Sequence, residues 1–292
     1  MKSFLAIFFL MIPVIELVAQ DDLMDLADQE TQQETNYIEQ TFKGTRLING
    51  HSIETRKKGV LDVIISHRFG RLNSGAYELF GLDESNVRLG LDYGITDRLN
   101  AGFGRNSFQK TYDGFLKYKL IRQQQGDERK VPVSVTGFSS IALRTLKSGD
   151  PAGEPNLNSR LTYTYQVIIA RKFSPSFSFQ ISPTLVHRNA VMAEQDANDI
   201  YALGAGGRIK LNKRLSLNAE YYYQFNRVAN SVIQNSVAIG FDIETGGHVF
   251  QLHFTNSRAM IEKGFITETT GDFFEGDIHF GFNISRTFQL YE

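Results

Sequence analysis

The sequence predicts an all-β fold, a closed antiparallel transmembrane β-barrel of about 12 strands with short periplasmic turns and long extracellular loops. Three observations lead to this prediction. Apolar and polar residues alternate with a period of two, the alternating segments exceed the roughly five or six residues typical of soluble strands, and short connections alternate with long ones. A tilted strand needs about 9–11 residues to cross a bilayer, and the segments reach that length.

The composition excludes several classes of protein. The 292 residues contain no Cys, which rules out a disulfide scaffold, a thiolate zinc site and a cysteine nucleophile. With 31 Lys and Arg against 32 Asp and Glu, the chain lacks the basic surplus of a nucleic-acid-binding protein. We therefore expect no nucleic acid partner, and no motif indicates a cofactor.

The first residues have the layout of a secretory signal peptide. Lys2 supplies a positive start, residues 4–14 form an apolar run, and the small residue Ala19 follows. The apolar run is too short for a spanning helix. We expect residues 1–19 to be removed on export, so that the mature chain leaves the cytoplasm.

Residues 20–58 form a second region, which we expect to be a periplasmic leader with a hairpin or a lumenal plug. Its first part is acidic as far as Glu39, whereas its second part is basic. Residues 45–48 and 53–55 flank Asn49-Gly50, a pair favoured in hairpin turns because both residues tolerate positive φ. The sequence therefore predicts a small hairpin that turns at Asn49-Gly50.

Residues 59–292 carry the alternation and form the predicted outer-membrane barrel. Each segment has one apolar and one polar face; in the first segment Leu61 and Val63 share one face, while Asp62 lies on the other. We expect the apolar faces to meet lipid and the polar faces to surround the lumen. The predicted strands lie near 59–69, 86–95, 98–106, 112–122, 131–143, 160–173, 176–187, 199–211, 214–225, 235–244, 247–256 and 277–289.

The connections distinguish the two ends of the barrel. Those after even-numbered strands are mostly tight, as at 96–98 and 212–214, and those after odd-numbered strands are mostly long, as at 144–159 and 257–276. Both termini then fall at the short-turn end, as in outer-membrane barrels. A bilayer also forces closure, because open edges leave backbone groups unpaired in hydrocarbon. The alternative is a soluble β-sandwich or lipocalin-like fold, whose apolar faces would point inward.

Two stretches resemble a known family. FKGTRLINGHSIETRKKGVLDVIISHRFG (42–70) and LGLDYGITDRLNAGFGRN (89–106) are similar to a Bacteroidota family of outer-membrane β-barrel proteins of unknown function, and the resemblance covers roughly residues 41–290. It implies an outer-membrane location, and therefore contact with outer-membrane lipid. The last predicted strand resembles the terminal-strand signal by which outer-membrane barrels are recognised, so we expect insertion by the barrel-assembly machinery; its alternating residues are Ile278, Phe280, Phe282, Ile284 and Phe288. The family resemblance implies no catalytic residues.

Charged residues and histidines recur on the predicted inner face, and they admit two interpretations. In the first, a charged wall lines a channel that selects anionic or zwitterionic solutes. In the second, the charges pair with one another and with the N-terminal segment inside a plugged barrel. About twelve strands give a lumen between the filled and the open extremes, so size does not decide. The lumen-lining candidates are Asp62, Arg68, Arg88, Asp92, Lys117, Lys119, Arg208, Glu220, Asp242, His253 and His279.

The histidines offer little catalytic chemistry. None has a Ser two positions later, as in one type of phospholipase barrel, and the adjacent pair Ser66-His67 points to opposite faces of a strand. His253 and His279 could form a weak metal site with a nearby carboxylate from Asp272, Glu275 or Asp277. We favour a hydrogen-bonded polar pair, and we expect neither a bound metal nor an enzyme.

Two other segments carry structural predictions. The small residues at 204–207 mark either a place where a neighbouring element can approach the strand closely or a curvature of the strand. The loop 257–276 mixes Phe with Glu and could serve in recognition, fold back as a constriction, or pack on itself at the surface, and we favour the last. For the whole chain we expect a channel or transporter for small solutes. The alternative is a closed barrel that anchors periplasmic or surface partners.

Overall fold

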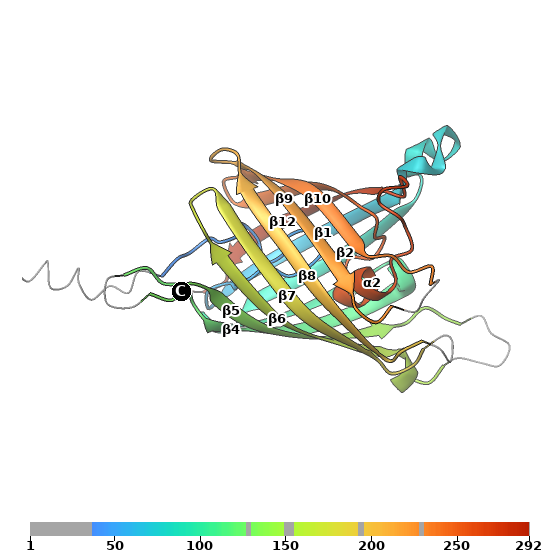
Figure 1. Cartoon of the computed structure of the whole chain (residues 1–292), viewed down its shortest axis with the longest axis horizontal. Helices are drawn as coiled ribbons and strands as arrows, with labels where there is room; N and C mark the ends of the chain where they lie inside the picture. The colour runs from blue at the N-terminus through green and yellow to red at the C-terminus, as the bar shows by residue number, and fades with distance from the viewer. Residues whose placement is uncertain (1–36, 127–129, 149–154, 192–195, 228–230, 292) are drawn as a thin grey trace, which may run out of the picture.

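The computed structural model describes residues 37–126, 130–148, 155–191, 196–227 and 231–291, so the predicted signal peptide lies outside the described residues. Twelve antiparallel strands follow one another around a closed barrel, and β1 pairs with β12 to complete it (Figure 1). The predicted fold is confirmed. The strands are β1 (Val60–Arg71), β2 (Ser85–Gly94), β3 (Leu99–Asn106), β4 (Thr111–Ile121), β5 (Ser134–Arg144), β6 (Leu161–Lys172), β7 (Phe177–Arg188), β8 (Asp199–Lys210), β9 (Leu215–Gln224), β10 (Ser236–Thr245), β11 (His248–Thr255) and β12 (His279–Gln289).

Side chains alternate between the inside and the outside of the barrel. In β2, Arg88 and Asp92 are buried, whereas Leu89 and Leu91 are 58% and 45% exposed. The same alternation runs through the other strands and gives the barrel an apolar outer surface. An apolar exterior around a polar interior suits lipid, and the soluble alternative is wrong because its apolar faces would point inward.

Short and long connections lie mostly at opposite ends of the barrel, as predicted. Tight turns join β2 to β3, β6 to β7, β8 to β9 and β10 to β11. The other end carries the 3-10 helices η1 (Leu72–Ser74), η2 (Ala76–Gly81), η3 (Phe108–Lys110) and η4 (Asn158–Arg160), and the helix α2 (Glu262–Thr267). No helix in the described ranges has the length and apolar character needed to cross a bilayer. Because Val60 pairs with Gln289, β1 begins and β12 ends at the short-turn end, which is periplasmic in outer-membrane barrels.

One strand boundary differs clearly from its prediction. β5 begins at Ser134, whereas the alternation places its start near 131. Val131 instead pairs with Gln124 inside the β4–β5 connection, and Gln124 also pairs with Tyr37. The local pairing removes Val131 from the barrel wall and makes this short-end connection longer than the others.

Residues 37–58, which we call the plug, enter the barrel at its short-turn end, reverse direction and return to β1 (Figure 1). At the entry, the Ile38 N–H donates to the carbonyl oxygen of Gln123 in the β4–β5 connection at 2.9 Å. At the exit, the Lys58 N–H donates to Asp97 Oδ1 in the β2–β3 turn at 3.0 Å. Both ends of the plug are therefore tied to the rim of the barrel at its short-turn end.

The turn of the plug differs in detail from its prediction. The Leu47 N–H donates to the Gly50 carbonyl oxygen at 2.8 Å, and Arg46 pairs with His51, so the chain does reverse here. Neither Asn49 nor Gly50 has a positive φ. The reversal is centred on Ile48 and Asn49, one residue earlier than predicted, and it does not use the backbone conformation that Asn-Gly pairs favour.

Apolar side chains of the plug pack on the inner wall. The ring centroid of His51 lies 4.4 Å from those of both Phe115 and Phe138. These contacts give the interior an apolar core at the level of β4 to β6. The cluster combines Phe42, Leu47 and Ile53 of the plug with Phe115, Phe138, Ile168 and Ala170 of the wall.

The last long loop contradicts the favoured prediction. Its first half folds into the barrel, so that every residue of α2 is buried and Phe265 is 0% exposed, while Phe274 in the second half is 90% exposed. The Phe265 ring packs edge-on against the ring of Tyr222, with centroids 4.9 Å apart. The loop folds inward because this lumen is wide enough to accept its apolar side chains, which would otherwise face water.

Candidate functional site

A single carboxylate on the inner wall holds the turn of the plug. Glu220 of β9 accepts the backbone N–H groups of Ile48 at 3.2 Å, Asn49 at 2.8 Å and Gly50 at 3.2 Å. Three successive amides form a concave anion site, and the carboxylate occupies it. This contact explains why the turn departs from an ordinary hairpin, since the Gly50 N–H bonds to Glu220.

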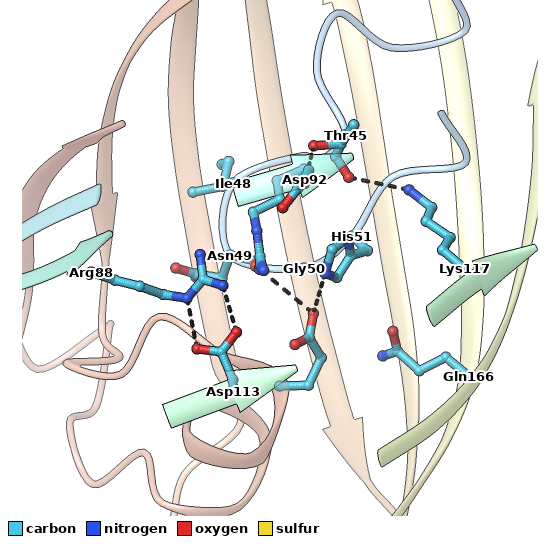
Figure 2. Close-up of polar contacts among 12 residues, drawn as sticks. Thr45, Ile48, Asn49, Gly50, His51, Arg88, Asp92, Asp113, Lys117 and Gln166 are labelled. Carbon is cyan, nitrogen blue, oxygen red and sulfur yellow. Dashed lines mark hydrogen bonds and ion pairs between the residues drawn. The ribbon is translucent and has the colours of Figure 1, made fainter. Parts of the chain in front are cut away.

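A second group of wall charges holds the arms of the plug (Figure 2). Thr45 Oγ1 donates to Asp92 Oδ2 at 2.7 Å, and Lys117 Nζ donates to the Thr45 carbonyl oxygen at 3.3 Å. Lys117 Nζ also donates to the carbonyl oxygen of Glu54 in the returning arm, at 2.5 Å. Lys117 thereby bridges the two arms of the plug.

Arg88 lies beside this group but serves the wall itself. Its Nε and Nη2 donate to the two carboxylate oxygens of Asp113 at 3.0 and 2.5 Å, a bidentate pair between β2 and β4 (Figure 2). Both residues point inward, so the pair spans part of the lumen. Asp113 is an inward-facing acid that the sequence analysis did not include.

The remaining charged candidates also lie on the inner face. Arg68 donates to Asn49 Oδ1 at 2.8 Å and to the Ser257 carbonyl oxygen at 2.7 Å, which links the wall to both inserted segments. The other candidates also meet partners inside the barrel, and Thr287 Oγ1 donates to Asp62 Oδ1 at 2.6 Å. Asp62 accepts Arg56 Nε at 2.5 Å, Arg208 Nη2 donates to the Gln40 carbonyl oxygen at 3.3 Å, Asp242 Oδ1 accepts Gln251 Nε2 at 2.6 Å, and Lys119 Nζ lies 3.8 Å from Glu54 Oε2.

The two candidate histidines are buried but do not bond to each other. His279 Nδ1 lies 2.9 Å from the Phe69 carbonyl oxygen, and both ring nitrogens of His253 lack a hydrogen-bond partner among the described residues. The expected hydrogen-bonded pair is therefore wrong, because the β11–β12 register sets His253 opposite Gly281. Asp277 bonds to Asn73 at 2.7 Å instead. Within the described ranges, no group of three or more His or carboxylate residues could hold a metal ion.

Neutral amides on the inner wall also bind the plug, and the sequence analysis missed them. Gln180 accepts the Ile53 N–H at 3.2 Å and donates to the His51 carbonyl oxygen at 2.9 Å. Asn283 and Gln251 donate to the carbonyl oxygens of Ile48 and Leu47, at 3.1 and 2.5 Å. All three amides have inward parity in their strands, so parity without regard to charge would have found them.

The strand register also joins a histidine to a hydroxyl. Ser85 Oγ lies 3.0 Å from His67 Nε2, although the two residues are far apart in sequence. Adjacency along one strand excludes such a pair, but pairing of β1 with β2 creates it. His67 Nδ1 has no hydrogen-bond partner, so nothing in the described chain orients the imidazole as a catalytic triad requires.

Small residues of β8 admit the plug, as one of the two interpretations of the 204–207 run predicts. A Cβ added at Gly206 would lie 2.2 Å from Leu47 Cδ2, closer than any such contact allows. Gly204 has the same role toward the ring of Tyr222. The wall is thus contoured to the segments that fill it.

The plug and α2 meet inside the barrel. Arg46 Nη1 and His51 Nε2 of the plug lie 3.8 and 3.9 Å from Glu262 Oε1, at the start of α2. The plug enters from the short-turn end and α2 from the long-loop end, so this contact links the two inserted segments inside the barrel. The interpretation in which wall charges pair with the N-terminal segment describes this structure.

Comparisons with solved structures find porins and an outer membrane channel of low sequence identity. No curated protein matches the chain. Among solved structures, the NanC porin aligns with a TM-score of 0.49 and 11% identity, over 79% of this chain and 100% of that one. The KdgM porin aligns with 0.46 and 8%, over 78% and 99%. The COG4313 outer membrane channel from Pseudomonas putida F1 aligns with 0.45 and 12%, over 85% and 100%.

A family model assigns the chain to a protein family. It matches residues 42–288 and so includes most of the plug as well as the barrel. The match spans far more than half of the chain. The protein belongs to the family described as membrane bound beta barrel domain (DUF5777).

Proposed function

We propose that this outer-membrane barrel is a channel for small solutes whose lumen the plug and α2 close in this structure. The observation that carries the proposal is that neither segment belongs to the wall. The wall closes through the β1–β12 pairing alone, and the space that it encloses is large enough to hold an extended hairpin and a helix. If these segments move aside, a solute pathway with a polar lining remains.

The contacts that hold the plug suit reversible docking. Most of them join a wall side chain to a plug backbone group, as at Glu220, Gln180 and Asn283. Water replaces such bonds at a low net cost, since an intramolecular hydrogen bond contributes only about 0.5–1.5 kcal/mol net. The wall residues remain compatible with water after the plug leaves.

The test locks the plug in place in the full mature chain. Because the protein has no Cys, Thr45→Cys and Asp92→Cys introduce the only thiols, at side chains that are 2.7 Å apart in the native structure. A short bis-methanethiosulfonate reagent joins them, and dithiothreitol releases them. In planar bilayers we expect discrete conductance steps from the reduced protein and their loss when the bridge forms.

Two controls make the result specific. Each single Cys variant carries the reagent without a bridge, which separates locking from simple blockage of the lumen. A folded, reduced barrel that shows no conductance steps would contradict the channel and support the alternative function of a closed membrane anchor. Conductance that is unchanged by the bridge would contradict gating by the plug.

A further inference from the structure

A cavity lined in part by α2 lies at the long-loop end of the barrel. Its volume is about 620 Å³, within the range of roughly 300–1,000 Å³ that small-molecule sites occupy. The inner-face ends of β5 to β9 form its walls, and α2 contributes Lys263, Thr267 and Glu268 to its lining. We call this cavity the vestibule.

The vestibule has an excess of positive charge. Arg144 and Arg188 occupy the inward parity of the last positions in β5 and β7, and Arg227 follows β9. Its charged lining residues are the cations Arg144, Arg160, Arg188, Arg227 and Lys263 and the carboxylates Asp196 and Glu268.

The two charged residues that α2 contributes to the vestibule neutralise each other. Lys263 Nζ lies 2.5 Å from Glu268 Oε1, and Gln109 bonds to both residues, at 2.8 Å from Lys263 Nζ and 3.2 Å from Glu268 Oε2. One of the two carboxylates is thereby engaged. The excess positive charge belongs to the arginines of the wall.

Three of these arginines have no carboxylate partner among the described residues. Arg188 Nη2 donates to the Ala197 carbonyl oxygen at 2.5 Å, and its buried Nε makes no hydrogen bond. Arg227 Nη1 donates only to neutral oxygens, those of Ile233 at 3.0 Å and Gln234 at 3.4 Å. Arg144 takes part in no ion pair with the residues that the structure describes. Asp196 is the one other carboxylate in the lining, so the guanidinium groups outnumber the counter-charges. Guanidinium groups in excess in a partly enclosed cavity favour an anionic occupant.

We infer that the vestibule binds small organic anions through Arg144, Arg188 and Arg227. This inference rests on the proposed function, because it names small organic anions as the class of solute that would enter the channel. The binding itself does not require conduction. A planar carboxylate matches the paired donors of a guanidinium, and the enclosed setting strengthens the attraction relative to bulk water.

The experiment measures binding at equilibrium to the full mature barrel in detergent. Succinate, its neutral analogue succinamide and the dication 1,4-diaminobutane share a four-carbon chain and differ in charge, and equilibrium dialysis of each at moderate ionic strength gives its affinity. We expect succinate to bind more tightly than succinamide and the diamine not to bind. In the double variant Arg188→Gln and Arg227→Gln, we expect succinate to lose at least about tenfold in affinity, because bonds to charged groups are the strong ones.

A matched control is available on the outer face. Arg105→Gln removes the same charge from β3 at the same end of the barrel, but its side chain is exposed on the lipid side and bonds to Tyr112. We expect this variant to bind succinate as the native protein does. Equal binding of succinate and succinamide, or an unchanged affinity in the double variant, would overturn the inference.

The result is independent of the conductance test. A barrel that binds succinate through the arginines but never conducts would refute the channel and leave the vestibule site standing. A conducting barrel with no preference for succinate would do the opposite. Resistance of the unheated variants to unfolding in dodecyl sulfate shows that their barrels are intact.

Discussion

Replacing Glu220 with Gln tests how the plug is held. The carboxylate accepts the Asn49 N–H through Oε1 and those of Ile48 and Gly50 through Oε2. The Glu220→Gln side chain would keep one oxygen and place an NH₂ group where the other oxygen was. Since an NH₂ group cannot accept a hydrogen bond, at least one plug amide loses its partner, and the remaining bonds lose their charge.

The expected size of the effect follows from these bonds. A bond to a charged group contributes about 1.5–3 kcal/mol and a bond between neutral groups about 0.5–1.5 kcal/mol, while an unpartnered buried donor costs about 1–3 kcal/mol. Part of this loss is offset because the variant no longer buries a charge. We expect the docked state to lose about 2 kcal/mol, which increases the undocked population about 30-fold.

A single introduced thiol reports on docking. Ser52 lies in the returning arm of the plug and is 0% exposed, and the protein has no Cys of its own, so Ser52→Cys is a unique probe. Its rate of reaction with a polar maleimide measures the undocked fraction, and the Glu220→Gln change should raise that rate about 30-fold, in line with the energy above. Asp199→Asn removes one negative charge at an exposed position of β8 and should leave the rate unchanged. A rate in Glu220→Gln within about twofold of the native rate, with the barrel intact, would refute the argument that the amide site holds the plug.

Three further predictions address other contacts. Gly206→Val should expel the turn of the plug and raise the Ser52→Cys labelling rate, since its Cβ would lie 2.2 Å from Leu47 Cδ2, whereas Gly207→Val, with its nearest neighbour at 3.5 Å, should not. Phe265→Ala should destabilise the docked helix by about 3–5 kcal/mol and expose Lys263 to trypsin, while Phe274→Ala, at a 90% exposed position, should change neither. The hydrogen bond from Asn73, with the one from the Asp272 N–H and the charge of Arg71, lowers the pKa of Asp277. The stabilisation from this loop contact is therefore present above the ordinary Asp pKa of about 4 and is lost as the pH falls below it. Carboxyl NMR should show the Asp277 pKa rising in Asn73→Ala, and an unchanged pKa would contradict the assignment of its cause.

The strands of the barrel wall are predictable because the sequence pattern that specifies them is local. Leu89 and Leu91 alternate with Arg88 and Asp92 within a few positions, and a strand whose two faces meet lipid and water must show that period. Connection lengths add the distinction between the two ends. The sequence therefore specifies the strands, their orientation and the closure of the barrel.

The segments inside the lumen are positioned by contacts with residues far away in the sequence, and the predictions about these segments failed. The Asn49-Gly50 pair favours a standard hairpin turn, but a carboxylate on β9, far along the chain, captures the amides on which that turn depends. The loop that carries Phe265 and Phe274 has the same composition whether it packs inside or outside. Ser85 and His67 meet only through strand register. Each of these arrangements depends on a contact with residues that are distant in the sequence.

The contact of Arg46 with Glu262 joins the plug, inserted from the short-turn end, to α2, inserted from the long-loop end. If the barrel is the channel that we propose, two separate displacements are needed to clear it. Displacing the plug alone leaves α2 in place, and displacing α2 alone leaves the plug, so opening would require events at both ends of the barrel.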